Sequence, residues 1–172
     1  EIESVEVGLP RVGWNIIGDP EAAKQNPKNV VECQFSMPFV AAVALREGGM
    51  EWDDYARHIE DAETLSLCRR VTSVVDAQAE AEFPARLSGV ARVRTARGLF
   101  EEFVAVPKGE PENFVTPAEL RAKFDGLTGP YLDAGERDAL AMMLLSLEEA
   151  DDAGAVLRLS WPSEPTRAGA GA

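Results

Sequence analysis

The alternation of apolar and polar residues along the chain predicts four β-strands, at residues 2–9, 71–75, 87–95 and 99–106. In the first strand Val5, Val7 and Leu9 recur at every second position, which is the period of a strand with one buried face. The second strand is rich in β-branched residues. The last two are separated by Ala96-Arg97-Gly98, a turn sequence whose glycine suits a positive φ. These two strands are therefore expected to form a hairpin.

Helical periodicity and capping residues predict a buried helix soon after the first strand. The segment 35–45 is apolar on nearly all sides, so its helix should be covered on more than one side. Ser36 can cap its N-terminus, Pro38 is tolerated in its first turn, and Gly48-Gly49 ends it. Shorter helices are predicted at 52–59 and 61–68.

Two capping boxes predict further helices after the hairpin. Thr116-Pro117-Ala118-Glu119 places proline at the first helical position, and Asp133 with Glu136 forms a similar pair before a longer helix. The apolar stripe of that longer helix consists of Leu140, Met143, Leu144 and Leu147. An acidic run at 148–152 ends it, and one more short helix is expected at 153–160.

The order of these elements predicts an α+β fold. We expect roughly four strands in an antiparallel or mixed sheet, with helices packed on one face, followed by C-terminal helices. Residues 10–32, which contain three prolines and no sustained periodicity, are expected to be either a functional loop or a disordered connector. The predicted domains are 1–130 for the α+β part, 131–160 for the C-terminal helices and 161–172 for a flexible tail.

The charge and composition of the chain exclude some classes of binding partner. The formal net charge is -13, which argues against nucleic acid and anionic membranes, whose phosphates attract basic surfaces. No apolar run in the given sequence is long enough to span a membrane, and no signal peptide is visible in it. Because the first residue is Glu1 rather than methionine, we expect the sequence to be a piece of a longer protein.

The few cysteines and the single histidine limit the chemistry. Cys33 and Cys68 form no CxxC pair and, with one histidine, offer too few ligands for a zinc or iron–sulfur site. We expect both thiols to be buried in a reducing cytoplasm, and we expect no cofactor. His58 is interpreted as a surface or capping residue rather than a catalyst, and no G-x-S-x-G, Walker or dinucleotide-binding motif occurs.

Several segments in a fixed order resemble the C-terminal part of the MmgE/PrpD family, which includes 2-methylcitrate dehydratase and cis-aconitate decarboxylase. The segments that carry the resemblance are Ile2-Glu3-Ser4-Val5-Glu6-Val7, Phe35-Ser36-Met37-Pro38-Phe39-Val40-Ala41-Ala42-Val43-Ala44-Leu45, Pro107-Lys108-Gly109-Glu110-Pro111-Glu112-Asn113, Thr116-Pro117-Ala118-Glu119-Leu120 and Lys123-Phe124. Each segment alone is a weak signal, but together they span residues 1–160 in the order and spacing of the family.

The resemblance implies a two-domain enzyme of which this chain is the lid portion. In the family a mainly helical domain carries most catalytic residues, and the C-terminal helices return to it. The family's lysine- and histidine-bearing motif lies upstream of the opening strand, so the chain alone is expected to lack the general acid and base and to have no catalytic residue. The implied chemistry is cofactor-independent dehydration, decarboxylation or epimerisation of small di- and tricarboxylates, in a homodimer.

The same resemblance implies four candidate substrate-binding residues: Gln34, Phe35, Ser36 and Phe39. Relatives often carry lysine where this chain has Gln34 and tyrosine where it has Phe39. Ser36 is either an anion contact at a helix N-terminus or a plain N-cap. Phe35 and Phe39 are either pocket walls or core residues. Three basic residues of the long loop could screen a polycarboxylate, namely Arg11, Lys24 and Lys28.

Two hypotheses for function follow. The first is the lid of a hydro-lyase, decarboxylase or epimerase, inactive when isolated. The alternative is a non-catalytic binding or oligomerisation module that keeps the lid fold, which the missing acid/base motif and Phe39 motivate. Under the first hypothesis the helices at 133–160 should expose apolar side chains such as Met142, Met143 and Leu147.

Overall fold

The computed structural model describes residues 1–161, which form two compact units. Unit 1 is Glu1–Phe114, and unit 2 begins at Val115. Of the tail predicted at 161–172, all but the first residue lies outside the described residues. The domain limits predicted at 130 and 160 stay predictions.

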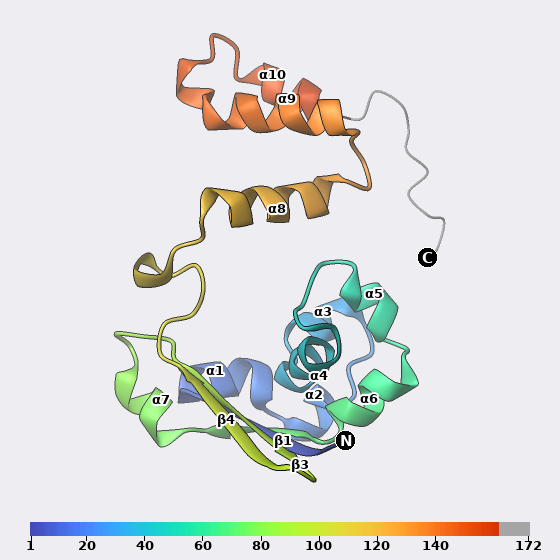
Figure 1. The fold of residues 1–172 in the computed structure, drawn as a ribbon, viewed down its shortest axis with the longest axis vertical. Helices are drawn as coiled ribbons and strands as arrows, with labels where there is room; N and C mark the ends of the chain where they lie inside the picture. The colour runs from blue at the N-terminus through green and yellow to red at the C-terminus, as the bar shows by residue number, and fades with distance from the viewer. Residues whose placement is uncertain (162–172) are drawn as a thin grey trace. The chain divides into compact units, whose positions relative to one another are not determined.

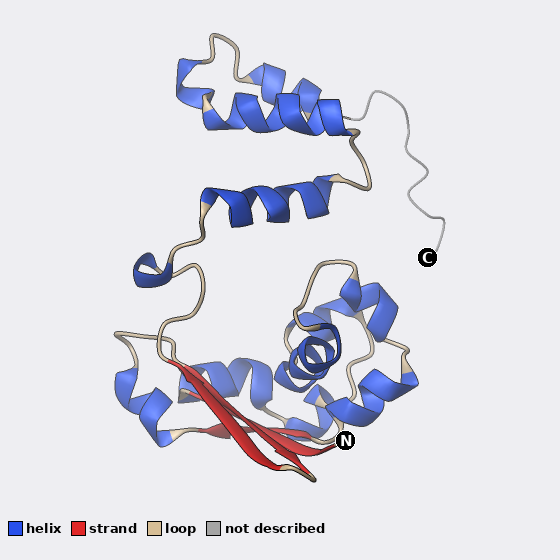
Figure 2. Cartoon of the chain, viewed as in Figure 1, coloured by secondary structure: helices blue, strands red, loops and turns tan. Residues whose placement is uncertain are grey.

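Unit 1 contains a four-stranded mixed sheet, drawn in red in Figure 2. Its strands are β1 (Ile2–Leu9), β2 (Val71–Val75), β3 (Gly89–Thr95) and β4 (Gly98–Val104), in the spatial order β2-β1-β3-β4. β1 pairs parallel to β2 and antiparallel to β3, and β3 and β4 form the predicted hairpin. The α+β prediction is therefore confirmed, and the sheet is of the mixed kind.

Short helices connect β1 to β2 and lie on one face of the sheet (Figure 1). They are α1 (Arg11–Gly13), η1 (Trp14–Gly18, a π-helical turn), α2 (Glu21–Lys24), α3 (Val30–Gln34), α4 (Met37–Glu47), α5 (Asp54–His58) and α6 (Ala62–Cys68). A parallel pair of neighbouring strands requires such a crossover, because the chain must return to the end of the sheet from which it started.

The expectation of a loop or disordered connector at 10–32 is wrong, since most of this segment is helical. Tertiary hydrogen bonds hold its short turns in place. Trp14 Nε1 donates to the carbonyl oxygen of Ser73 at 3.0 Å, and Gln25 Nε2 donates to that of Val71 at 2.8 Å. The segment that follows β2 is helical too, as α7 (Ala77–Glu82).

The buried helix α4 forms as predicted and is central to the core of unit 1. Ser36 caps its N-terminus, and Gly48 ends it with φ +82°, where its N–H donates to the carbonyl oxygen of Ala44 at 2.9 Å. The core that α4 joins consists of Val5, Val7, Cys33, Phe39, Ala42, Val43, Leu67, Cys68 and Val71. These residues come from two strands and three helices, so burial of α4 ties the crossover to the sheet.

The opposite face of the sheet carries charge. Arg92 on β3 donates to Glu6 on β1 at 2.9 Å, to Asp76 at 2.9 Å and to Glu101 on β4 at 2.6 Å. These hydrogen bonds, with that to Glu101 the strongest, raise the pKa of Arg92. The guanidinium of Arg92 therefore joins β1, β3 and β4 on the face of the sheet opposite the helices that connect β1 to β2. It also binds Asp76, which follows the end of β2.

Unit 2 consists of helices α8 (Pro117–Thr128), α9 (Ala134–Leu145), η3 (Leu147–Glu149) and α10 (Gly154–Leu159), and η2 (Pro111–Asn113) closes unit 1. Both predicted capping boxes are present, at Thr116 with Glu119 and at Asp133 with Glu136. Leu140 is buried, whereas Met142 and Leu147 are exposed and Met143 is half-buried.

Replacing Gly8 by alanine should destabilise unit 1. An added Cβ would lie 2.5 Å from Val90 Cγ1 and 2.7 Å from Asp76 Cβ, so the strand and the start of α7 would have to shift. We expect the free energy of unfolding in urea to fall by about 1 to 3 kcal/mol, as for other overpacked sites. Gly49→Ala is the matched control, because no atom lies within 4 Å of its added Cβ. Equal stability of the two variants would contradict this packing.

Candidate functional site

The N-terminus of α4 holds the residues that the sequence singled out. Ser36 is buried, its hydroxyl accepts a hydrogen bond from the Phe39 N–H at 3.0 Å, and it donates to the carbonyl oxygen of Lys24 at 2.5 Å. Ser36 is therefore the N-cap of α4, and its contact with an anion stays a prediction. The same hydroxyl also fixes the end of α2 against the start of α4.

Lys24 links the segments around this N-terminus. Its ammonium donates to the carbonyl oxygen of Ile16 in η1 at 2.7 Å and to that of Phe35 at 2.8 Å. Together with the Ser36 hydrogen bond, these contacts join η1, α2 and the residue pair that precedes α4. Of the three basic residues predicted to screen a polycarboxylate, Lys24 is thus the one next to the candidate site. Arg11 and Lys28 are exposed, in α1 and before α3.

The four candidate residues lie in different environments. Phe39 is fully buried and stacks on Tyr55, with ring centroids 6.4 Å apart. Phe35 is half-exposed, and Gln34 is partly buried at the end of α3. Phe39 is thus a core residue of unit 1, whereas Phe35 offers an apolar surface beside the Lys24 ammonium. A role of any of the four in substrate binding stays a prediction.

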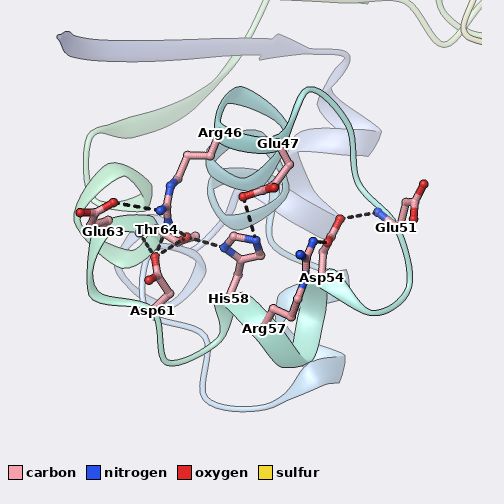
Figure 3. Close-up of polar contacts among 9 residues, drawn as sticks. All are labelled: Arg46, Glu47, Glu51, Asp54, Arg57, His58, Asp61, Glu63 and Thr64. Atoms are coloured by element: carbon pink, nitrogen blue, oxygen red, sulfur yellow. Dashed lines mark hydrogen bonds and ion pairs between the residues drawn. The ribbon is translucent and has the colours of Figure 1, made fainter.

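His58 is buried, which the sequence interpretation as a surface or capping residue missed (Figure 3). Its Nδ1 lies 2.7 Å from Thr64 Oγ1, and its Nε2 lies 3.4 Å from a carboxylate oxygen of Glu47. The imidazole therefore connects the end of α4 to α6 through α5. Glu47 and Thr64 lie on helices other than the one that carries His58, so no short sequence motif could have indicated these contacts.

Thr64 and Arg46 extend this network, as Figure 3 shows. Thr64 Oγ1 lies 2.8 Å from Asp61 Oδ1, and Arg46 donates to Thr64, to Asp61 and, at 2.9 Å, to Glu63. The N–H and hydroxyl of Thr64, together with Arg46, lower the pKa of Asp61 to about 2. Because both His58 and Thr64 are buried, the imidazole serves to join α4, α5 and α6 and is not presented to solvent.

Both cysteines are buried, as predicted. Desolvation, with a smaller effect of Glu32, raises the pKa of Cys33 to about 11, and desolvation raises that of Cys68 to about 12. Neither thiol is therefore an activated nucleophile. Within residues 1–161 no group of three or more histidine, cysteine or acidic side chains could hold a metal ion, and no helix is long and apolar enough to cross a membrane.

Comparison of the chain with models of known protein families assigns it to a family. Residues 1–149 match the MmgE/PrpD C-terminal domain. The chain belongs to the MmgE/PrpD family. The match confirms both the family predicted from the sequence and the assignment to its C-terminal portion. No curated protein matches the chain significantly. Within this MmgE/PrpD domain, the α4 N-terminus with Lys24 and Phe35 is the candidate functional surface.

Replacing Ser36 by alanine should destabilise the MmgE/PrpD domain even without any ligand. The variant loses the cap on Phe39 N–H and leaves the Lys24 carbonyl without its hydroxyl donor. We expect the free energy of unfolding to fall by about 1 to 2 kcal/mol. Ser66→Ala, at an exposed position in the middle of α6, should change it little. A Ser36→Ala variant as stable as the unaltered chain would contradict a stabilising role of these two hydrogen bonds.

The two thiols should react slowly with thiol reagents in the folded protein. With a pKa near 11, about 0.1 % of Cys33 is thiolate at pH 8, and for Cys68 the fraction is smaller still. The thiolate population rises with pH, so labelling should accelerate only in strongly alkaline solution or on unfolding. Reaction with an aromatic disulfide reagent, followed at pH 8 with and without urea, measures this. Fast labelling without urea would contradict the burial of both sulfurs.

Proposed function

We propose that this chain is the lid portion of a MmgE/PrpD enzyme that acts on a small di- or tricarboxylate, as a 2-methylcitrate dehydratase-like lyase, a decarboxylase or an epimerase. The observation that carries the proposal is the match of residues 1–149 to the C-terminal domain of the family. We further propose that the whole enzyme is a cytoplasmic homodimer that needs no cofactor.

The chemistry of such an enzyme supports a division of labour. Removing a proton next to a carboxylate needs a general base, a general acid and donors or cations that stabilise the developing enolate. His58 is the single histidine of the chain, and it is buried and bound to Thr64. The acid and base are therefore proposed to come from a helical catalytic domain, and the chain is proposed to be inactive alone.

The candidate surface at the α4 N-terminus is suited to the role of a lid. Phe35 presents an apolar ring, and the adjacent Lys24 ammonium is held by two carbonyl oxygens. A rigid apolar surface of this kind can exclude water when it closes on a substrate, which strengthens the electrostatic interactions of the site. Gln34, Phe35, Ser36 and Phe39 are proposed to contact or support the bound polycarboxylate.

Unit 2 supports a docking role for the C-terminal helices. Met142, Leu145, Leu157 and Trp161 are exposed by 66, 79, 74 and 80 %. Apolar side chains as exposed as these commonly mark an interaction surface when they are grouped. We propose that α9 and α10 dock on the helical catalytic domain.

A non-catalytic binding or oligomerisation module is the second candidate function. The observation that favours it is the burial of Phe39 in the core, with no hydroxyl at the position where relatives often carry tyrosine. A module of this kind would keep the fold of the family without contributing to turnover.

A chimaeric enzyme tests the proposed function. We expect the chain alone to show no turnover of 2-methylcitrate or cis-aconitate, because its single histidine, His58, is buried and bound to Thr64. Joined to the helical domain of an active family dehydratase in place of that enzyme's own C-terminal domain, it should restore turnover of the dehydratase's substrate. Product formation is followed by proton NMR, with the helical domain alone as the control.

Two outcomes would contradict the proposal. Turnover by the isolated chain would refute the argument that acid and base come from another domain. A chimaera that is folded by circular dichroism, binds substrate and has no activity above the helical domain alone would favour the non-catalytic module.

A further inference from the structure

Strand β4 lies at an edge of the sheet and is exposed along its length. In the order β2-β1-β3-β4, its one neighbour among the strands of residues 1–161 is β3. Every β4 residue except Phe103 is exposed, and Leu99, Phe100 and Val104 are exposed by about half. Natural proteins usually protect such an edge, because its free main-chain groups can pair with another strand.

The sheet register identifies which main-chain groups of β4 point outward. Val5 N–H donates toward β2, to the carbonyl oxygen of Arg70 at 2.9 Å, so the main chain of Val5 does not bond its β3 partner Val93. Val93 therefore exchanges its hydrogen bonds with Phe100 on β4. By alternation, the residues of β4 whose N–H and C=O groups point away from the sheet are Leu99, Glu101 and Phe103.

The side chains along this edge have the same pattern on both faces. Leu99, Glu101 and Phe103 share one face, and Phe100, Glu102 and Val104 share the other. On each face an acidic residue thus lies between two apolar residues. Glu101 is already bound to Arg92 at 2.6 Å. Glu102 is exposed and, in the part of the chain that the structure describes, forms no ion pair.

We propose that β4 binds an extended segment of a separate polypeptide, which adds to the sheet as a fifth strand and carries two adjacent basic residues flanked by apolar residues. Adjacent residues of a strand point to opposite faces, so the basic pair would meet Glu101 on one face and Glu102 on the other. Apolar neighbours would cover Leu99, Phe100 and Phe103. Outward main-chain groups would supply affinity, and the side chains would supply selectivity.

The charge pattern argues against a second copy of this chain as the occupant. Antiparallel pairing of two β4 strands over their whole length would place Glu101 opposite Glu101 and Phe100 opposite Glu102. Like charges directly opposite each other destabilise a strand pair. The chain also has a net charge of -13, which adds to the cost of pairing two acidic edges of this kind.

Binding of a designed peptide tests the proposal. The probe is fluorescein-labelled Thr-Val-Val-Arg-Arg-Val-Val-Thr, titrated with the full chain and followed by anisotropy. We expect saturable binding that weakens about five- to tenfold in Glu102→Lys, because an attractive cross-strand pair becomes repulsive. Glu112→Lys, the same change of charge at an exposed position outside the sheet, should bind like the unaltered chain. Circular dichroism checks that both variants fold.

Methylated peptides separate strand addition from simple charge attraction. Methyl groups on the peptide nitrogens that lie opposite Leu99, Glu101 and Phe103 in antiparallel pairing with β4 should abolish binding, because those N–H groups would face β4. Methyl groups on the alternate nitrogens should leave binding unchanged. Equal binding of the two methylated peptides, or no binding of the parent peptide, would overturn the proposal. So would light scattering that shows a dimer of the chain which Glu102→Lys dissociates, because a second copy would then occupy the edge.

Discussion

The parallel pairing of β1 with β2 is the constraint on which the rest of unit 1 depends. Two neighbouring strands that run the same way need a connection that crosses one face of the sheet. All the helices between them are consequently on that face, and α4 is buried against it. The opposite face stays free of these helices, and there Arg92 binds three carboxylates that the strands bring together.

The elements with local signals could be predicted from the sequence. Ser36, Gly48 and the two capping boxes mark helix ends through contacts within a few residues, and Gly98 marks the hairpin turn. Residues 10–32 carry no such signal, because their helical turns depend on acceptors far away in the sequence. Trp14 and Gln25 donate to carbonyl oxygens of β2, so their environment is defined only once β2 lies beside β1. The position of β2 beside β1 is itself a contact between distant parts of the sequence, so the sequence alone could not decide between an antiparallel and a mixed sheet.

The sequence locates the candidate site at the start of α4, but it does not predict which of the site's side chains are buried and which face outward. Ser36 and Phe39 are three residues apart, which places both on the buried side of the first turn of α4, whereas Phe35 precedes the helix and faces outward. A sequence pattern identifies this segment, but the direction of each side chain depends on the path of α2 and η1, which Lys24 fixes. His58 could not be placed either, because its partners Glu47 and Thr64 belong to two other helices.

The distribution of charge in unit 1 defines what this chain can contribute to a polycarboxylate site. Arg46 is bound to Asp61 and Glu63, Arg57 to Asp54, and Arg92 to three carboxylates, so these guanidiniums are neutralised within the chain. Lys24, whose ammonium is bound by neutral carbonyl oxygens, keeps its charge uncompensated by a carboxylate in these contacts. A polycarboxylate carries two or three negative charges, more than the single charge of Lys24 can balance. Binding of the proposed polycarboxylate therefore needs further cations besides Lys24. This favours a contribution of shape and exclusion of water over one of charge, as expected for a lid.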